Sequence, residues 1–279
     1  MGAWAAPLRK AVAIVLAAAS LAEPAAAQSA KVAVDLELVL AVDISYSMDA
    51  DEQKLQRDGY VAALTSKPVL DAVRQGLIGR IAVAFVEWAG VDEQRTLIPW
   101  TVIDGAESAA AFAARLQASP LRRAYRTSIS GGLIHAARLF QDSGFEASRQ
   151  VIDVSGDGPN NQGAPVGAIR DEVVERGVVI NGLPLMLKRP SYASAELLDL
   201  DVYYRDCVVG GPGAFVLPVR GVDQFPEAVR TKLVMEISGV TAPSHIGLAP
   251  AVRATPVAEE RPQIDCSAGE QLWRERFGD

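Results

Sequence analysis

Short apolar runs alternate with amphipathic segments along most of this chain, and this alternation limits the possible folds more than any other feature. Residues 34–43 (VDLELVLAVD) are predicted to form a first strand, which is nearly continuous in apolar residues toward its end. Such strands are typical of parallel sheets whose two faces are both covered by helices. Further strands are expected at residues 80–88, 95–103, 149–157, 177–185 and 213–219. The pattern predicts an α/β fold with a doubly wound, mostly parallel sheet flanked by helices.

Helix boundaries are also marked in the sequence. Asp49 is the expected N-cap of the first helix, because Glu52 three residues later completes a capping box. Apolar residues at helical spacing predict a last helix over 225–237, which Gly239 ends. The strands at 80–88 and 95–103 are joined by a turn that contains glycine, so we expect a hairpin and one antiparallel edge strand.

The N-terminal segment has the order of a secretory signal. Arg9 and Lys10 precede the apolar run AVAIVLAAASLA, and the small residues of EPAAAQ follow it. The run is shorter than the roughly 20 residues that a spanning helix needs. We expect residues 1–27 to be a signal peptide cleaved after Ala27, and the mature chain to be periplasmic or secreted without a transmembrane span. A retained N-terminal anchor is the alternative.

Charge and cysteine content narrow the class of protein further. The formal net charge of −7 argues against a nucleic-acid partner, which usually requires a basic surface. In an oxidising compartment, Cys207 and Cys266 suggest one disulfide, with two unrelated thiols as the alternative. The bridge would tether residues 241–279, a tail rich in Pro and Ala in which LWRERF could form a short terminal helix.

Oxygen-bearing side chains stand where strands pass into loops, which is where open parallel sheets bind ligands. Asp43, Ser45 and Ser47 close the first strand, Asp157 closes the strand at 149–157, and Thr127 opens a helix. Carboxylates and hydroxyls without nitrogen or sulfur ligands suit a hard cation such as Mg²⁺. In the alternative, Asp43 and Asp157 only cap loops and helices. That arrangement would leave two carboxylates facing one another without neutralisation, which is costly.

These residues, in this order, resemble the metal-ion-dependent adhesion site (MIDAS) of von Willebrand factor type A (VWA) domains. Asp43, Ser45 and Ser47 match the D-x-S-x-S element, Thr127 the second-loop threonine, and Asp157 the third-loop aspartate. The resemblance implies a Rossmann-like three-layer sandwich over residues 32–240. It also implies Mg²⁺, with Mn²⁺ or Ca²⁺ as alternatives, bound directly by the hydroxyls and directly or through water by the aspartates.

The chain departs from the VWA pattern in two places. Arg126 stands where many relatives have a glycine before the threonine, and Ser155-Gly156 precedes Asp157 where Thr-Asp-Gly is usual. The phrases DGYVAAL, AFVEWAG, VIDVSGDGPNN and GGPGAFVLPV resemble a bacterial group of exported proteins, the DUF1194 family.

The resemblance implies a non-enzymatic binding module of adhesion or assembly type, in which an acidic residue of an unknown protein partner completes the metal coordination. A metal-dependent hydrolase and a VWA domain with a purely structural metal are the alternatives. The sequence contains no G-x-S-x-G elbow, no P-loop and no zinc-ligand spacing.

Four further positions carry weaker expectations. Asp153, inside a predicted strand, is expected to be a hydrogen-bonded structural residue in preference to a support of the metal site. Glu87 and Trp88 end a strand at the same edge of the sheet and either rim the site or pack against it. His135 is expected to be a core or surface histidine in preference to a catalytic base.

Overall fold

The structure is a computed structural model that describes residues 1–2, 30–187, 199–239, 255–256 and 264–278. All but the first two residues of the expected signal peptide, and most of the expected tail, lie outside the described residues. In the described part of the chain, no helix has the length and apolar character needed to cross a membrane.

The described strands form a seven-stranded sheet in the order β4-β3-β2-β6-β7-β8-β9. Its central strands are parallel, and the β3–β4 hairpin supplies the expected antiparallel edge, so the predicted α/β fold is confirmed. A second, two-stranded sheet pairs β1 with β5. The strands are β1 (Val32–Val34), β2 (Leu36–Asp43), β3 (Ile81–Trp88), β4 (Gln94–Ile103), β5 (Phe145–Ala147), β6 (Gln150–Gly156), β7 (Val179–Pro184), β8 (Phe215–Val216) and β9 (Thr255–Pro256).

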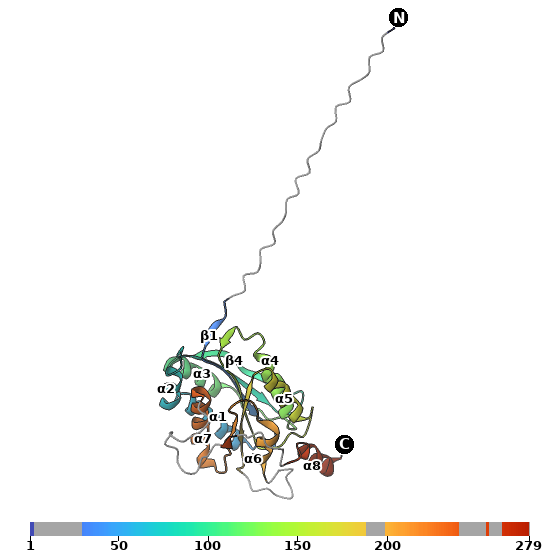
Figure 1. Ribbon diagram of the computed structural model, residues 1–279. Coiled ribbons are helices and arrows are strands. Elements are labelled where there is room, and N and C mark those ends of the chain that lie inside the picture. The colour runs from blue at the N-terminus through green and yellow to red at the C-terminus, as the bar shows by residue number, and fades with distance from the viewer. Residues whose placement is uncertain (3–29, 188–198, 240–254, 257–263, 279) are drawn as a thin grey trace. The chain divides into compact units, whose positions relative to one another are not determined.

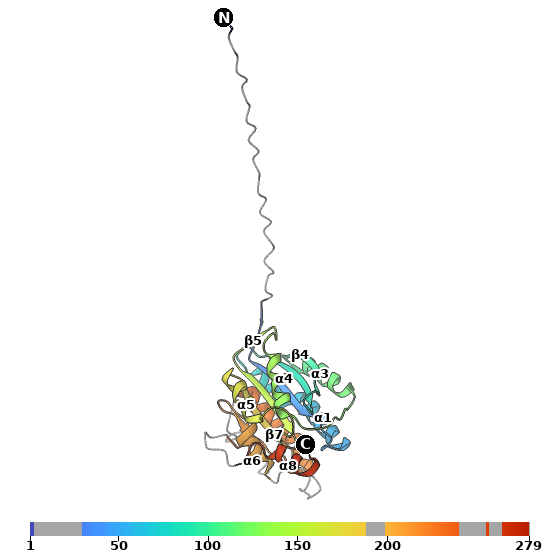
Figure 2. The same ribbon diagram turned by 90° about the vertical axis from the view of Figure 1, so that its right-hand side faces the viewer.

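Helices cover both faces of the main sheet (Figures 1 and 2). One face is covered by α1 (Ala50–Leu64), α2 (Lys67–Arg74), α3 (Ala106–Ala118) and α7 (Phe225–Ser238). The other is covered by α4 (Ile129–Leu139), α5 (Val166–Glu175), α6 (Leu200–Tyr203) and the π-helix η1 (Tyr204–Val208). A 3-10 turn, η2 (Val222–Gln224), leads into α7, and α8 (Ala268–Phe277) is the last described helix.

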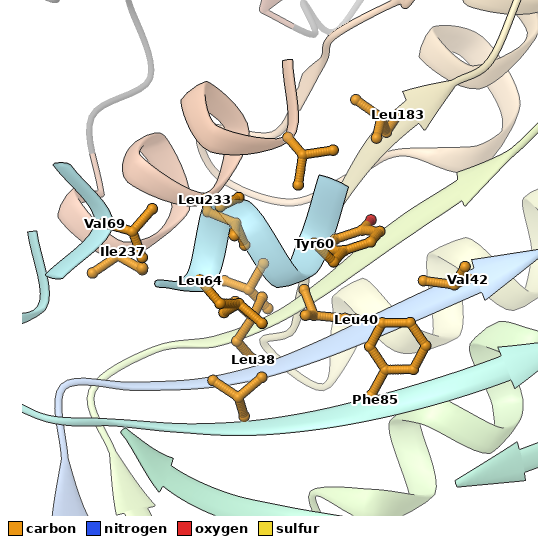
Figure 3. Packing of buried hydrophobic residues seen from close by; sticks show 14 of the residues in the cluster. Leu38, Leu40, Val42, Tyr60, Leu64, Val69, Phe85, Leu183, Leu233 and Ile237 are labelled. Atoms are coloured by element: carbon orange, nitrogen blue, oxygen red, sulfur yellow. The ribbon is translucent and has the colours of Figure 1, made fainter. Parts of the chain in front are cut away.

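The alternation of side chains along β2 explains why this strand is apolar throughout. Leu38 and Leu40 point to the face that α1 and α7 cover, where Figure 3 shows them beside Tyr60 and Leu233. Val39 and its alternate neighbours pack on the opposite face, against α4 and α5. Each fully buried aliphatic side chain contributes about 1.5–3 kcal/mol of hydrophobic stabilisation. Both cores depend on β2, which therefore holds its carboxyl end, and the loop after it, in a fixed position.

The expected helix boundaries are confirmed at both ends of the domain. Asp49 caps α1 through a complete capping box: the Glu52 amide donates to Asp49 Oδ1 at 2.9 Å, and the Asp49 amide donates to Glu52 Oε2 at 2.8 Å. Gly239 ends α7 with a φ of 70°, in the left-handed region that glycine adopts without strain. Because α1 begins at Ala50, the loop of residues 44–49 is fixed by β2 before it and by the cap after it.

The last strands differ from the expectation. The strand expected at 213–219 is only two residues long, Phe215–Val216. Gly213 has a φ of 74°, which turns the chain just before it. The segment still runs along β7 beyond Val216, because the Leu217 and Val219 amides donate to the Gly182 and Pro184 carbonyls at 2.9 and 3.0 Å. Part of the expected tail, β9, pairs antiparallel with β8 and gives the sheet a second antiparallel edge.

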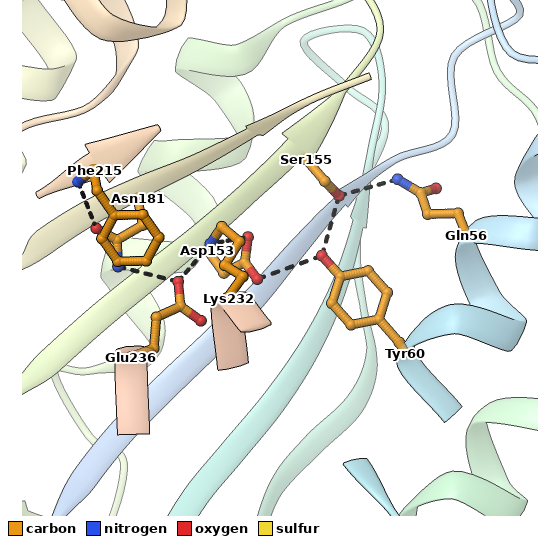
Figure 4. A network of polar contacts seen from close by, with 8 residues as sticks. All are labelled: Gln56, Tyr60, Asp153, Ser155, Asn181, Phe215, Lys232 and Glu236. Carbon is orange, nitrogen blue, oxygen red and sulfur yellow. Dashed lines mark hydrogen bonds and ion pairs between the residues drawn. The ribbon is translucent and has the colours of Figure 1, made fainter. Parts of the chain in front are cut away.

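Asp153 belongs to a buried polar network between β6 and α7 (Figure 4). Its Oδ1 lies 2.6 Å from Lys232 Nζ, and Tyr60 donates to its Oδ2 at 3.4 Å. Lys232 also pairs with Glu236, whose Oε1 accepts from Asn181 at 3.0 Å. Two carboxylates thus share one buried ammonium group, and the expectation of a structural role for Asp153 is confirmed.

Candidate metal centre

The oxygen-bearing side chains predicted as metal ligands lie at the carboxyl edge of the sheet. Asp43 is the last residue of β2 and is fully buried, and Ser45 is buried just after it. Ser47 lies exposed in the same loop, and Asp157 is half-buried directly after β6. Thr127 is buried two residues before α4. Because β2 and β6 are adjacent parallel strands, their ends meet at one point of this edge.

Short hydrogen bonds join the loop after β2 to the loop after β6. The Ser45 amide donates to Asp43 Oδ1 at 2.7 Å, which turns the chain back immediately after the strand. The Ser45 and Ser47 hydroxyls are 2.6 Å apart, and Ser47 Oγ donates to Asp157 Oδ1 at 2.6 Å. The structure therefore brings four of the five predicted ligands into one connected cluster.

Thr127 lines the same cleft as this cluster but is held by a different neighbour. Its amide donates to Asn161 Oδ1 at 3.0 Å, and the Asn161 amide donates to its carbonyl at 2.8 Å. The side chain of the preceding residue, Asn160, accepts from the Ser130 amide at 3.0 Å. Through these hydrogen bonds, the two asparagines connect the loop that carries Asp157 to the start of α4. Sequence reasoning assigned them no role, although they directly follow the strand-end Asp-Gly-Pro.

The second carboxylate oxygen of Asp43 has no hydrogen-bond partner among the described residues, although it is buried. Burial, followed by the negative charge of Asp157, raises the pKa of Asp43 well above its ordinary value. A buried carboxylate beside a like charge is unfavourable unless a cation neutralises it. Hydrogen bonds from Ser45 and from the Asp157 backbone offset part of this rise, and a divalent cation would neutralise the charge that remains.

Gly156 explains one departure from the usual VWA sequence. A Cβ atom at this position would lie 2.9 Å from Asp43 Oδ2 and equally close to the Tyr204 hydroxyl. Any side chain here would therefore displace the Asp43 carboxylate or Tyr204. Tyr204, in η1, is fully buried, and its hydroxyl has no partner in the described part of the chain. Burial, and then the charge of Asp43, raises the pKa of Tyr204.

Arg126 explains the second departure. It has a φ of 71° and is the one non-glycine residue with positive φ in the described chain. A backbone in this region costs an arginine on the order of 1 kcal/mol, which is why glycine suits the position in other sequences. The Arg126 guanidinium lies 3.6 Å from the centre of the Trp273 ring, so a cation–π contact offsets the cost.

The donor set fits a hard divalent cation. It consists of two carboxylates and three hydroxyls, with oxygen as the sole donor element. Within the described ranges, no group of three or more His, Cys, Asp or Glu side chains is placed to hold a metal.

The candidate metal centre opens into a cleft of about 390 Å³. Part of its wall comes from α8, through Trp273, Arg276 and Phe277, which sequence reasoning did not connect with the site. Cys207 in η1 and Cys266 form a disulfide whose Cα atoms are 5.4 Å apart. The bridge holds the segment leading into α8 against the domain.

The three other side chains considered from the sequence, Glu87, Trp88 and His135, do not line this cleft. Glu87 is buried and pairs with Arg57 at 2.6 Å and Arg95 at 2.8 Å, so it does not rim the cleft. Trp88 is fully buried and packs against Gly132, in agreement with the packing alternative. His135 lies 2.9 Å from Thr96 Oγ1 in a different pocket, and burial lowers its pKa.

A family model described as "Protein of unknown function (DUF1194)" matches residues 33–241. Several solved structures share the fold. Proximal thread matrix protein 1 of the mussel byssus has a TM-score of 0.54 at 15% identity, over 75% of this chain and 49% of that chain. A von Willebrand factor type A protein of Catenulispora acidiphila has a TM-score of 0.52 at 15% identity, over 73% of this chain and 43% of that chain. The pilus adhesin SpaC of Lactobacillus rhamnosus GG has a TM-score of 0.55 at 10% identity, over 74% of this chain and 31% of that chain.

This chain spans half or less of the length of those three proteins. A further structure of the byssus protein is described as having a zinc-occupied MIDAS motif. No curated protein sequence matches the chain. At these identities the likenesses establish the VWA-like fold alone.

Proposed function

The chain belongs to the DUF1194 family, and we propose that it is a divalent-cation-dependent protein-binding module of adhesion or assembly type. Asp43, Ser45, Ser47, Thr127 and Asp157 would hold the ion, which we propose to be Mg²⁺, with Mn²⁺ or Ca²⁺ as alternatives. When bound, the cation would attract a carboxylate oxygen from a partner protein into its open coordination position.

The observation that carries this proposal is the state of Asp43. Its Oδ2 atom is buried without a hydrogen-bond partner in the described residues, and the charge of Asp157 acts on it. A purely structural role would not require an aspartate at position 43. An asparagine would keep the hydrogen bond from the Ser45 amide and would remove the buried charge. A cation relieves both the burial cost and the repulsion.

The residues at the proposed metal site have distinct roles. The Ser45, Ser47 and Thr127 hydroxyls would offer neutral oxygens, so the two carboxylates would do no more than balance the charge of a divalent cation. Five protein ligands would leave one octahedral position of Mg²⁺ for an oxygen of a partner. Asn161 holds Thr127 in position through two backbone hydrogen bonds. Ser47 links the first loop to Asp157.

We further propose that residues 1–27 are a signal peptide and that residues 32–240 act as an exported VWA module, followed by the tail at 241–279. Two structural neighbours, a byssus matrix protein and a pilus adhesin, are consistent with a binding role outside the cytoplasm. A hydrolase would need a general base beside the metal. No histidine lines the described part of the cleft, so no observation favours that alternative.

A paired pull-down tests the proposal. Immobilised wild-type protein and the Asp43→Asn variant are incubated with periplasmic extract in Mg²⁺ or in chelator, and Asp142→Asn, an exposed site remote in sequence from the ligands, serves as control. We expect partner proteins on wild type and Asp142→Asn in Mg²⁺ only. Identical captures with and without chelator, or with and without the Asp43 charge, would overturn the proposal.

A further inference from the structure

Exposed aromatic side chains gather at the mouth of the metal cleft. In the part of the chain that the structure describes, the largely exposed aromatic side chains are Tyr46, Tyr125 and Phe277, at 46%, 75% and 57% exposure. All of them line this cleft. Tyr46 and Tyr125 stack on each other, with ring centroids 4.4 Å apart. Aromatic residues are enriched where proteins bind other proteins, so this mouth has the composition of a binding surface.

Helix α8 is a fixed wall of the cleft. Asn160 Nδ2 donates to Glu270 Oε1 at 2.7 Å, next to the loop that carries Asp157. A Cβ atom on Gly269 would lie 2.0 Å from the Asn160 carbonyl oxygen, so glycine alone permits this close approach. The Cys207–Cys266 disulfide ties the start of the helix to η1, and α8 lies beside α6 in both views (Figures 1 and 2).

The charge of the cleft wall is opposite to that of the whole chain. The chain has a formal net charge of −7. The cleft wall, however, receives Arg276 from α8 and Arg126 from the loop before α4. Asp157, a predicted metal ligand, is the one acidic side chain among the described residues of the lining. A cationic wall beside a cation site attracts anionic groups and repels basic ones.

The two arginines are not equivalent. The Arg126 guanidinium is stacked on Trp273 at 3.6 Å, which fixes it within the wall. Arg276 is exposed, and its guanidinium lies 5.2 Å from the Phe277 ring. Other arginines of the described chain pair with carboxylates, among them Arg95, Arg122 and Arg220, but no ion pair among the described residues involves Arg126 or Arg276. Arg276 is therefore the side chain that is available to pair with an incoming anion.

We propose that the cleft selects an extended segment of a partner protein that carries two acidic residues, one for the metal and one for Arg276. Apolar side chains between or beside these residues pack on Tyr46, Tyr125 and Phe277. The inference rests on the proposed function, because the first carboxylate completes the metal coordination. It adds the second carboxylate, and it assigns the C-terminal helix a direct role in partner selection.

Fluorescent peptides test this inference. One short peptide carries a single Asp among Gly, Ser and Leu residues, and a series carries a second Asp at increasing spacing from the first. Binding is measured by anisotropy in Mg²⁺ and in chelator, for wild type, Arg276→Gln and Arg274→Gln. Arg274 is the matched control, because it is exposed on the same helix but does not line the cleft.

The best diacidic peptide is expected to bind wild type and Arg274→Gln about fivefold more tightly than the single-Asp peptide, which is the range of one partly exposed ion pair. Arg276→Gln should lose this preference while its Mg²⁺ affinity and its binding of the single-Asp peptide stay unchanged. Circular dichroism checks that each variant is folded.

Three results would overturn the inference: a preference that survives in Arg276→Gln, no preference at any spacing, or no measurable peptide binding by a metal-loaded protein. Mg²⁺-dependent dimerisation that blocks the cleft would show that a second copy of the chain is the occupant. A protein that binds no metal would instead contradict the proposed function, so the two failures are distinguishable.

Discussion

The Ser47 hydroxyl donates to Asp157 Oδ1 at 2.6 Å, although 110 residues separate the two positions in the sequence. The contact arises because β2 and β6 are adjacent parallel strands, whose carboxyl ends meet at the same edge of the sheet. The same edge holds Asp43, a buried carboxylate that lies near the like charge of Asp157 and whose Oδ2 atom has no hydrogen-bond partner in the described chain.

Mg²⁺ should stabilise the wild-type protein but not Asp43→Asn. A ligand at 100 times its dissociation constant adds about 2.7 kcal/mol to the free energy of unfolding. In chelator the order reverses: Asp43→Asn should be more stable than wild type by on the order of 1–2 kcal/mol, because it removes a buried, repelled charge. Urea unfolding at neutral pH measures both. A variant that is less stable in chelator, or equally stabilised by Mg²⁺, would contradict this account.

The stability of the domain should fall as pH rises from about 4.5 to about 7, through Glu236. Burial, and then the charge of Asp153, raises the pKa of Glu236 from 4.5 to about 7. The folded state therefore binds more protons than the unfolded state in this window, and the stabilisation present below it is lost as Glu236 ionises. The loss should be at most about 3 kcal/mol.

Glu236→Gln should reduce this pH dependence, since Lys232 then pairs with Asp153 alone. Glu175→Gln, an exposed site at the end of α5, is the control and should behave as wild type. Unfolding free energies measured across the window check the prediction. A slope in Glu236→Gln that equals the wild-type slope would show that another group titrates.

Loss of the disulfide should destabilise the domain and release α8. Cys207 and Cys266 are 59 residues apart in sequence, and a bridge over this length contributes up to about 4 kcal/mol in the chain-entropy model. The double variant Cys207→Ser/Cys266→Ser should therefore unfold at lower urea, and its Trp273 emission should shift to the red as α8 leaves Arg126. Unchanged stability and emission after replacement would contradict a tethering role.

Gly269→Ala should displace α8 without unfolding the sheet. Its Cβ would overlap the Asn160 carbonyl oxygen at 2.0 Å, and backbone cannot move as easily as a flexible side chain. We expect a destabilisation of about 1–3 kcal/mol and weaker binding of diacidic peptides. Gly105→Ala is the matched control, because nothing lies within 4 Å of a Cβ at that N-cap. Equal behaviour of the two variants would show that α8 is not closely docked.

Much of the fold could be predicted from local sequence patterns. The apolar run of β2, the capping box at Asp49 and the glycine stop at Gly239 are short-range signals, and the structure confirms each of them. The proximity of Asp43 and Asp157 followed from one topological rule, that ligands gather beyond the carboxyl ends of parallel strands. That these residues bind a metal stays a prediction.

The contacts of α8 could not be predicted in this way. Its docking depends on the missing side chain of Gly269 and on the stack between Arg126 and Trp273, which are far apart in sequence and match no periodic pattern. The positive φ of Arg126 was visible only as an unusual residue before Thr127. Strand β8 was predicted too long, because an apolar segment does not reveal where regular strand geometry ends, even though Leu217 and Val219 still donate to β7.

A calorimetric Mg²⁺ titration of the folded, chelator-treated protein tests the central claim most directly. Wild type and the exposed-site control Asp142→Asn should each bind one Mg²⁺ per chain, and Asp157→Asn, which removes one of the two carboxylates at the site, should lose that binding. Absence of saturable Mg²⁺, Mn²⁺ and Ca²⁺ binding by wild type, or an unchanged isotherm for Asp157→Asn, would contradict the account.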